Sequence, residues 1–178
     1  MGQKTLVLGG IRSGKTALAE QTAAATGSKV VYVATATAGD EEMAQRIERH
    51  RALRPDDWGL AEEPVSLGQA LMQHRDTDKP PCLLVDCMSL WLSNLLAAGD
   101  ETLQRERVAF LEGVQNYPGE VVIVSNEVGL GIIGMDALTR RFCDELGRLN
   151  QDLASECHHV VMSVAGLPVV LKEGRQAD

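Results

Sequence analysis

A glycine-rich segment near the amino terminus carries the strongest chemical signal, Gly9-Gly10-Ile11-Arg12-Ser13-Gly14-Lys15-Thr16. It matches the G-x-x-x-x-G-K-[ST] pattern of a phosphate-binding loop at every fixed position. The glycines let successive backbone N–H groups converge on a phosphate, and a helix that begins at Lys15 adds the partial positive charge of its amino end. We expect Lys15 to reach the β and γ phosphates of a nucleotide and Thr16 to ligate Mg²⁺ through its hydroxyl.

Two carboxylates stand where apolar strands are predicted to end. Asp86 follows Leu83-Leu84-Val85 and could hold Mg²⁺ or a water of its shell opposite the phosphate loop. Glu127 follows the run that ends at Asn126, and the carboxyl ends of parallel strands are where open α/β sheets bind ligands. A role as a helix or turn cap explains Glu127 equally well, so both interpretations stay open.

A basic segment follows the second predicted strand. Four arginines and His50 fall within Arg46–Arg54, although the formal net charge of the chain is -8. Met43, Ile47 and His50 share one face of a helix. A neutral histidine there could attack a phosphorus atom whose oxygens the arginines neutralise. On spacing alone, a core histidine with solvated arginines is the simpler interpretation.

Apolar runs alternate with helical patterns along the chain. The runs are mostly continuous, which is typical of parallel strands covered on both faces. Their alternation with helices predicts an α/β fold of three layers, like that of phosphate-loop nucleoside triphosphatases, with a mostly parallel central sheet. The predicted strands are Thr5–Leu8, Val30–Ala34, Cys82–Asp86, Glu120–Ser125, Val160–Val164 and Val169–Lys172. The predicted helices are Lys15–Ala25, Glu41–Arg51, Leu67–Gln73, Leu90–Ala97, Glu101–Val114 and Leu138–Ser155.

Length and composition limit the classes of protein that fit. The 178 residues suit a single domain, residues 1–178. An acidic chain with 3% aromatic residues argues against a nucleic-acid surface. The sequence shows no signal segment and no apolar stretch long enough to span a membrane. The four cysteines lack CxxC spacing, so we expect reduced thiols in a cytoplasmic protein.

Taken together, these segments resemble the bifunctional adenosylcobinamide kinase/adenosylcobinamide-phosphate guanylyltransferase family of cobalamin biosynthesis. The resemblance covers nearly the whole chain. The phosphate loop is common to many families, and the more specific motifs lie elsewhere. They are Arg46-Ile47 with His50, Ser125-Asn126-Glu127-Val128-Gly129, and Arg148-Leu149-Asn150-Gln151.

The resemblance implies two activities. The first transfers the γ-phosphoryl group of ATP or GTP to the hydroxyl of the aminopropanol arm of adenosylcobinamide. The second transfers GMP from GTP to the resulting phosphate and releases pyrophosphate. In the family it passes through a histidine–GMP intermediate, which the resemblance assigns to His50. Some relatives carry a histidine just before this position, where the present chain has Arg49.

The resemblance also implies further nucleotide contacts, a Mg²⁺ cofactor at Thr16 and Asp86, and a homotrimer. The Gly129–Gly134 loop and the Trp91–Leu96 helix are the expected subunit contacts. The implied nucleotide-binding residues are Gly9, Gly10, Ile11, Arg12, Ser13, Gly14, Lys15, Thr16, Ala34, Thr35, Ala36, Arg51, Ala52, Leu53, Arg54, Glu62 and Asp86.

Two other functions fit parts of the sequence. One is a small-molecule kinase with the phosphate loop but no guanylyl intermediate. The other is a nucleotide-binding regulatory module without chemistry of its own. The Asn-Lys-x-Asp motif by which regulatory GTPases recognise guanine is absent from the sequence, which argues against the second.

Overall fold

Seven strands among the described residues form one sheet at the centre of the structure. The computed structural model describes residues 2–37, 55–75, 77–132 and 134–174. The strands lie side by side in the order β3-β2-β4-β5-β1-β6-β7. All neighbours are parallel except β6 and β7, which form an antiparallel hairpin. The strands are β1 (Lys4–Gly9), β2 (Val30–Ala34), β3 (Gly59–Glu62), β4 (Cys82–Asp86), β5 (Val121–Asn126), β6 (His159–Val164) and β7 (Leu167–Lys172).

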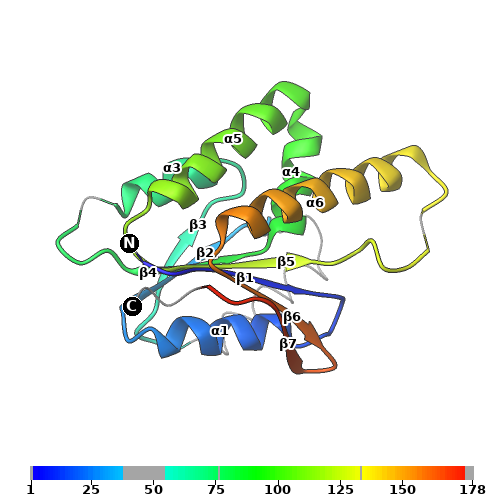
Figure 1. Cartoon of the computed structure of the whole chain (residues 1–178). Coiled ribbons are helices and arrows are strands. Elements are labelled where there is room, and N and C mark those ends of the chain that lie inside the picture. Colours follow the sequence, from blue (N-terminus) through cyan, green and yellow to red (C-terminus); the bar gives the residue numbers. More distant parts are fainter. Residues whose placement is uncertain (1, 38–54, 76, 133, 175–178) are drawn as a thin grey trace.

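Helices cover both faces of the sheet (Figure 1). One face carries α1, which contacts β1, β4, β5 and β6. The other face carries the remaining described helices, among which α3 packs on α5 and α4 packs on both α5 and α6. This arrangement confirms the predicted three-layer α/β fold. The helices are α1 (Lys15–Ala25), α3 (Leu67–Gln73), α4 (Met88–Ala98), α5 (Asp100–Asn116) and α6 (Ala137–Glu156).

Two apolar cores lie between these layers, because successive side chains of a strand point to opposite faces. In β1, Leu6 and Leu8 face the larger core under α3–α6, whereas Val7 faces α1. All six residues of β1 are buried. The continuous apolar runs of the sequence therefore arise because the central strands are covered on both sides.

The sequence missed one strand and misplaced some boundaries. β3 was not predicted, because Gly59–Glu62 is only four residues long and alternates between half-buried and exposed positions. Pairing with β6 in the hairpin starts β7 two residues earlier than predicted, at Leu167. β5 begins one residue later than predicted, at Val121. The predicted helix Glu41–Arg51 lies outside the described residues.

The predicted subunit contact Trp91–Leu96 contributes most of its apolar side chains to the core. Trp91, Leu92 and Leu95 are at most 1% exposed, whereas Ser93 is exposed and Leu96 is half-buried. The Trp91 ring packs against Phe110 of α5 with the ring centroids 5.1 Å apart. These buried side chains belong to the core, so only the exposed residues of the helix could contact another subunit.

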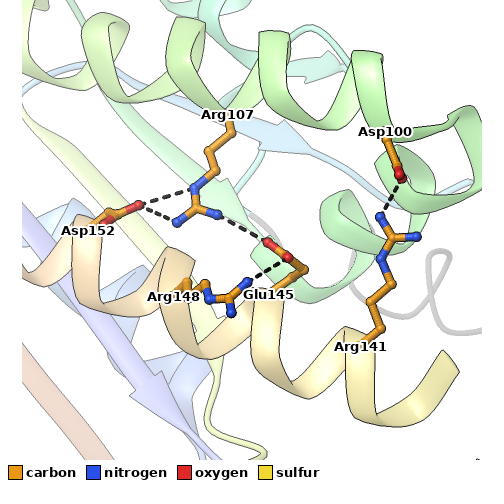
Figure 2. Close-up of polar contacts among 6 residues, drawn as sticks. All are labelled: Asp100, Arg107, Arg141, Glu145, Arg148 and Asp152. Atoms are coloured by element: carbon orange, nitrogen blue, oxygen red, sulfur yellow. Dashed lines mark hydrogen bonds and ion pairs between the residues drawn. The ribbon is translucent and has the colours of Figure 1, made fainter. Parts of the chain in front are cut away.

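Charged side chains join α5 to α6 across their outer surface (Figure 2). Arg107 of α5 donates to Asp152 through Nε (3.1 Å) and NH2 (2.5 Å), and to Glu145 through NH1 (3.2 Å). Arg148 donates to the other oxygen of Glu145 at 3.0 Å. Because Arg107 and Glu145 are less than one-fifth exposed, their ion pair is better shielded from water than a pair on the open surface.

Two further predictions from the sequence concern the cysteines and membrane-spanning segments. All four cysteines are free, and Cys82, Cys87 and Cys157 are buried. In the described part of the chain, no helix combines the length and apolar character that a membrane crossing requires.

Candidate nucleotide-binding site

The phosphate loop connects the carboxyl end of β1 to the first turn of α1. Ser13 N donates to Gly10 O at 3.3 Å, and the Lys15 ammonium donates to the same oxygen at 3.2 Å. Gly14, at φ 91°, is the N-cap residue of α1. The first amides of α1 have no partner within the helix, so the loop combines an ammonium group with amide donors suited to an anion.

A close approach explains the first glycine of this loop. A Cβ atom at Gly9 would lie 2.3 Å from Ser13 Oγ and 2.9 Å from the backbone oxygen of Ser163, so a side chain at this position would displace the surrounding chain. Ser13 is buried, and its Oγ has no hydrogen-bond partner among the described residues. By contrast, Ile11 at the tip of the loop is 86% exposed.

Asp86 lies opposite the loop, as predicted. Thr16 Oγ1 donates to Asp86 Oδ2 at 3.2 Å, and Tyr32 Oη donates to the same oxygen at 3.0 Å. A hydroxyl and a carboxylate are oxygen donors of the kind that Mg²⁺ prefers, and Mg²⁺ commonly takes only one or two carboxylates together with substrate phosphates. The described residues hold no group of three or more His, Cys, Asp or Glu placed for a metal ion.

Hydrogen bonds of Thr35 link the end of β2 to the end of β4. Its hydroxyl donates to Cys87 O and accepts from Cys87 N, both at 2.8 Å, and its backbone N donates to Asp86 O at 3.2 Å. The residue is fully buried, while Ala34 and Ala36 on either side are half-buried. The Thr35 side chain therefore holds the strand that carries Asp86.

Some of the other predicted nucleotide contacts lie among the described residues, and others do not. Glu62 is exposed at the carboxyl end of β3, paired in register with Ala34. The parallel strands thus bring Glu62, Ala34–Ala36, Asp86 and the phosphate loop together at their carboxyl ends. His50 and the adjoining Arg51, Ala52, Leu53 and Arg54 lie outside the described residues.

The two alternatives for Glu127 differ in what its carboxylate contacts. Its Oε1 accepts a hydrogen bond from Gly129 N at 2.7 Å, which is the contact of a turn cap. Its backbone N donates to Gly9 O at 3.1 Å, at the start of the phosphate loop. Glu127 therefore stabilises the turn after β5, and that turn lies beside the loop.

Asn126 is a site residue that the sequence analysis did not single out. It pairs with Gly9 in register, and alternation along β5 puts its side chain on the α1 face with Val124. Its Nδ2 donates to Ser89 Oγ at 3.0 Å, whereas its Oδ1 is buried without a partner among the described residues. Its place at the end of a strand, as for Asp86 and Glu127, was the available signal.

Cys87 lies next to Asp86 but is not a candidate nucleophile. Burial raises the pKa of its thiol, and the neighbouring Asp86 carboxylate raises it further. The thiolate is the reactive form of cysteine, so this side chain is unreactive near neutral pH.

Solved structures show the same fold. The chain is similar to the RadB recombinase with a TM-score of 0.53 and 20% identity, over 90% of this chain and 74% of that one. It is also similar to the structure titled PH0250 from Pyrococcus horikoshii, with a TM-score of 0.54 and 14% identity, over 97% of this chain and 87% of that one.

Sequence comparisons are more specific. A family model described as cobinamide kinase / cobinamide phosphate guanyltransferase matches residues 5–171. The chain is 49% identical to the bifunctional adenosylcobalamin biosynthesis protein CobP of Pseudomonas aeruginosa, over 95% of this chain and 97% of that protein. It is 35% identical to the protein CobU of Escherichia coli, which bears the same description, over 94% and 98%. The chain therefore belongs to the cobinamide kinase / cobinamide phosphate guanyltransferase family.

Proposed function

We propose that this enzyme phosphorylates adenosylcobinamide with ATP or GTP and then transfers GMP from GTP to adenosylcobinamide phosphate. The observation that carries the proposal is the placement of Lys15 and Thr16 of the phosphate loop opposite Asp86. Membership of the family supplies the substrate class. The kinase and the transferase step both handle a nucleoside triphosphate, which is the ligand that this loop suits.

The kinase step needs positioning and charge neutralisation more than covalent help from the protein. The hydroxyl oxygen of adenosylcobinamide bonds to the γ-phosphorus, and the nucleoside diphosphate leaves. The hydroxyl proton is released to solvent. Lys15 and the first amides of α1 hold the phosphate oxygens as negative charge moves onto the leaving group.

We assign the metal site to Thr16 and Asp86. When bound there, Mg²⁺ supplies Lewis-acid charge neutralisation to the phosphates. One carboxylate oxygen of Asp86 accepts hydrogen bonds from the hydroxyls of Thr16 and Tyr32, which hold the side chain in place. This fixed position supports the assignment.

His50 is the proposed nucleophile of the transferase step. An imidazole nitrogen bonds to the α-phosphorus of GTP while pyrophosphate leaves, and a phosphate oxygen of adenosylcobinamide phosphate then displaces the histidine. The covalent intermediate divides one exchange into two displacements. The neighbouring Arg51 and Arg54 have the planar donor geometry that suits phosphate oxygens.

We further propose that the enzyme is a cytoplasmic homotrimer. The free thiols fit a reducing compartment. Every residue of β7 is exposed, including Leu167, Val169, Val170 and Leu171. An apolar strand at the open edge of a sheet is a surface that proteins normally cover. The exposed Leu130 and Ile132 also leave the Gly129–Gly134 loop available as a contact.

Labelling with GTP tests the proposed intermediate. The protein is incubated with Mg²⁺ and GTP that carries a radioactive α-phosphate, in the absence of corrinoid. We expect a protein-bound label that acid removes and alkali does not, because a phosphoramidate has this stability. Adding adenosylcobinamide phosphate should discharge the label into adenosylcobinamide-GDP.

His50→Ala should abolish the label, and His74→Ala is the matched control. His74 is the C-cap residue of α3 and should leave labelling unchanged. Absence of label with His50 intact would contradict the transferase mechanism. Phosphorylation of adenosylcobinamide without any label would instead select the small-molecule kinase. Binding without either reaction would select the regulatory module.

A further inference from the structure

The turn of the β6–β7 hairpin packs directly against the phosphate loop. Ser163 Oγ donates to Ser13 O at 2.7 Å, and Gly166 N donates to the same oxygen at 2.8 Å. Ser163 is 1% exposed and pairs in register with Gly9. One carbonyl of the phosphate loop therefore receives two hydrogen bonds from a segment 150 residues further along the chain.

The hairpin turn has the shape that this contact needs. Ala165 (φ 52°) and Gly166 (φ 80°) form a two-residue turn between the paired Val164 and Leu167, as a tight hairpin with two positive φ angles requires. A Cβ atom at Gly14 would lie 3.1 Å from Gly166 Cα. The close approach of the two glycines brings Gly166 N within reach of Ser13 O.

The planarity of the peptide bond transmits this contact to the other side of the loop. In a trans peptide, the carbonyl of Ser13 and the N–H of Gly14 point in opposite directions. Two donors hold the Ser13 carbonyl towards the hairpin, so the Gly14 N–H is held towards the opposite side. That amide stands at the amino end of α1, where helices bind phosphate.

We propose that Ser163 is a positioning residue for the nucleotide phosphates, acting through the Ser13–Gly14 peptide. Its hydroxyl keeps the peptide in the orientation that presents the Gly14 amide to the phosphate, and Gly166 N assists from the turn. Without these donors, rotation of the peptide would turn a carbonyl oxygen towards an anion. The inference rests on the proposed use of the loop for nucleotide phosphates.

The test compares Ser163→Ala with Ser125→Ala. Ser125 is also a buried strand serine next to β1, and its hydroxyl donates to Asn150 Oδ1 at 2.6 Å. Both substitutions remove one buried hydrogen bond, but only that of Ser163 reaches the phosphate loop. Binding of Mg-GTP and of inorganic tripolyphosphate is measured by calorimetry, and stability is measured by thermal unfolding.

Ser163→Ala should weaken both ligands by the same factor, about fivefold to tenfold, which corresponds to one net hydrogen bond. Ser125→Ala should bind both ligands as the wild type does. Ser163→Cys, which keeps a side chain of the same connectivity with a larger atom and a weak donor, should fall between Ser163→Ala and the wild type. It provides a second variant if alanine prevents folding.

Three results would overturn the proposal. They are unchanged tripolyphosphate binding in Ser163→Ala, an equal loss in Ser125→Ala, and absence of tripolyphosphate binding by the wild-type protein. Failure of guanylyl transfer at His50 would leave the inference intact, because the measurement concerns only binding at the phosphate loop.

Discussion

Thr16 Oγ1 lies 3.2 Å from Asp86 Oδ2, although the two residues are 70 positions apart in the sequence. The first turn of α1 therefore contacts the carboxyl end of β4 through the Asp86 carboxylate. β5 lies between β1 and β4 in the sheet, so the contact bridges one intervening strand. This geometry connects the phosphate loop to the proposed metal site.

Asp86→Asn should remove the charge that the proposed site offers to Mg²⁺ while leaving an oxygen to accept from Thr16 and Tyr32. We expect kcat of both reactions to fall on the order of 100-fold, since charge stabilisation of the transition state is lost. The effect of Mg²⁺ on GTP affinity should also shrink.

Tyr32→Phe is the comparison for this variant, because it removes one hydroxyl from Asp86 but keeps the carboxylate. Its loss of activity should be less than about tenfold, the equivalent of one hydrogen bond. Steady-state kinetics over a Mg²⁺ titration measure both variants. Equal losses in the two would show that the charge of Asp86 is unimportant.

Arg107→Ala should destabilise the fold by about 1.5–3 kcal/mol, since it leaves Asp152 and Glu145 without their partner across the α5–α6 contact (Figure 2). Arg105→Ala is the control, because that side chain is 59% exposed and pairs only with its neighbour Glu106 among the contacts described. It should cost less than about 1 kcal/mol. Urea unfolding measures the free energy of unfolding of both variants. Similar losses in the two would contradict the role given to Arg107.

Burial lowers the pKa of Lys4 to about 8, even though its ammonium donates to Tyr117 O and Gly119 O. In the unfolded chain it titrates near 10.5. The unfolded state therefore binds more protons between these values, and the Lys4 contribution to stability rises with pH. From pH 8 to pH 9, the wild type should gain about 1 kcal/mol relative to Lys4→Met. Parallel stability curves for the two proteins would contradict this.

Burial raises the pKa of both Cys82 and Cys157 to about 12, from an ordinary value of 9.0. Above pH 9 the unfolded chain releases these protons and the folded chain retains them, so stability falls as pH rises. The limiting slope is about 1.4 kcal/mol per pH unit for each thiol. Cys82→Ala should flatten the curve between pH 9 and pH 10. Val160→Ala, a buried change without a titratable group, should shift the curve without altering its slope.

Val170→Lys should dissociate the enzyme if the exposed face of β7 forms the subunit contact. Val108→Lys on α5 is the matched control, since the two valines are 48% and 54% exposed. Analytical ultracentrifugation should find trimers for the wild type and the control, and smaller species for Val170→Lys. A monomeric wild type, or an unaffected Val170→Lys, would contradict the proposed contact.

Local patterns in the sequence determined the phosphate loop, most strands and the family, because glycine spacing and apolar runs are properties of neighbouring residues. Asp86 was predicted as well, since it ends an apolar run. β3 escaped prediction because four half-exposed residues leave little periodicity. Glu127 could not be assigned, because a carboxylate at a strand end suits a cap as well as a ligand.

Only the tertiary structure decided which apolar surfaces are buried and which distant groups meet. The sequence made Trp91–Leu96 a plausible contact surface, yet Trp91, Leu92 and Leu95 are buried in the core, whereas every residue of the apolar β7 is exposed. The contact of Ser163 with Ser13 has no local signature, since it depends on β6 lying beside β1. Strand order is set by packing over the whole chain, and it determines which side chains surround the phosphate loop.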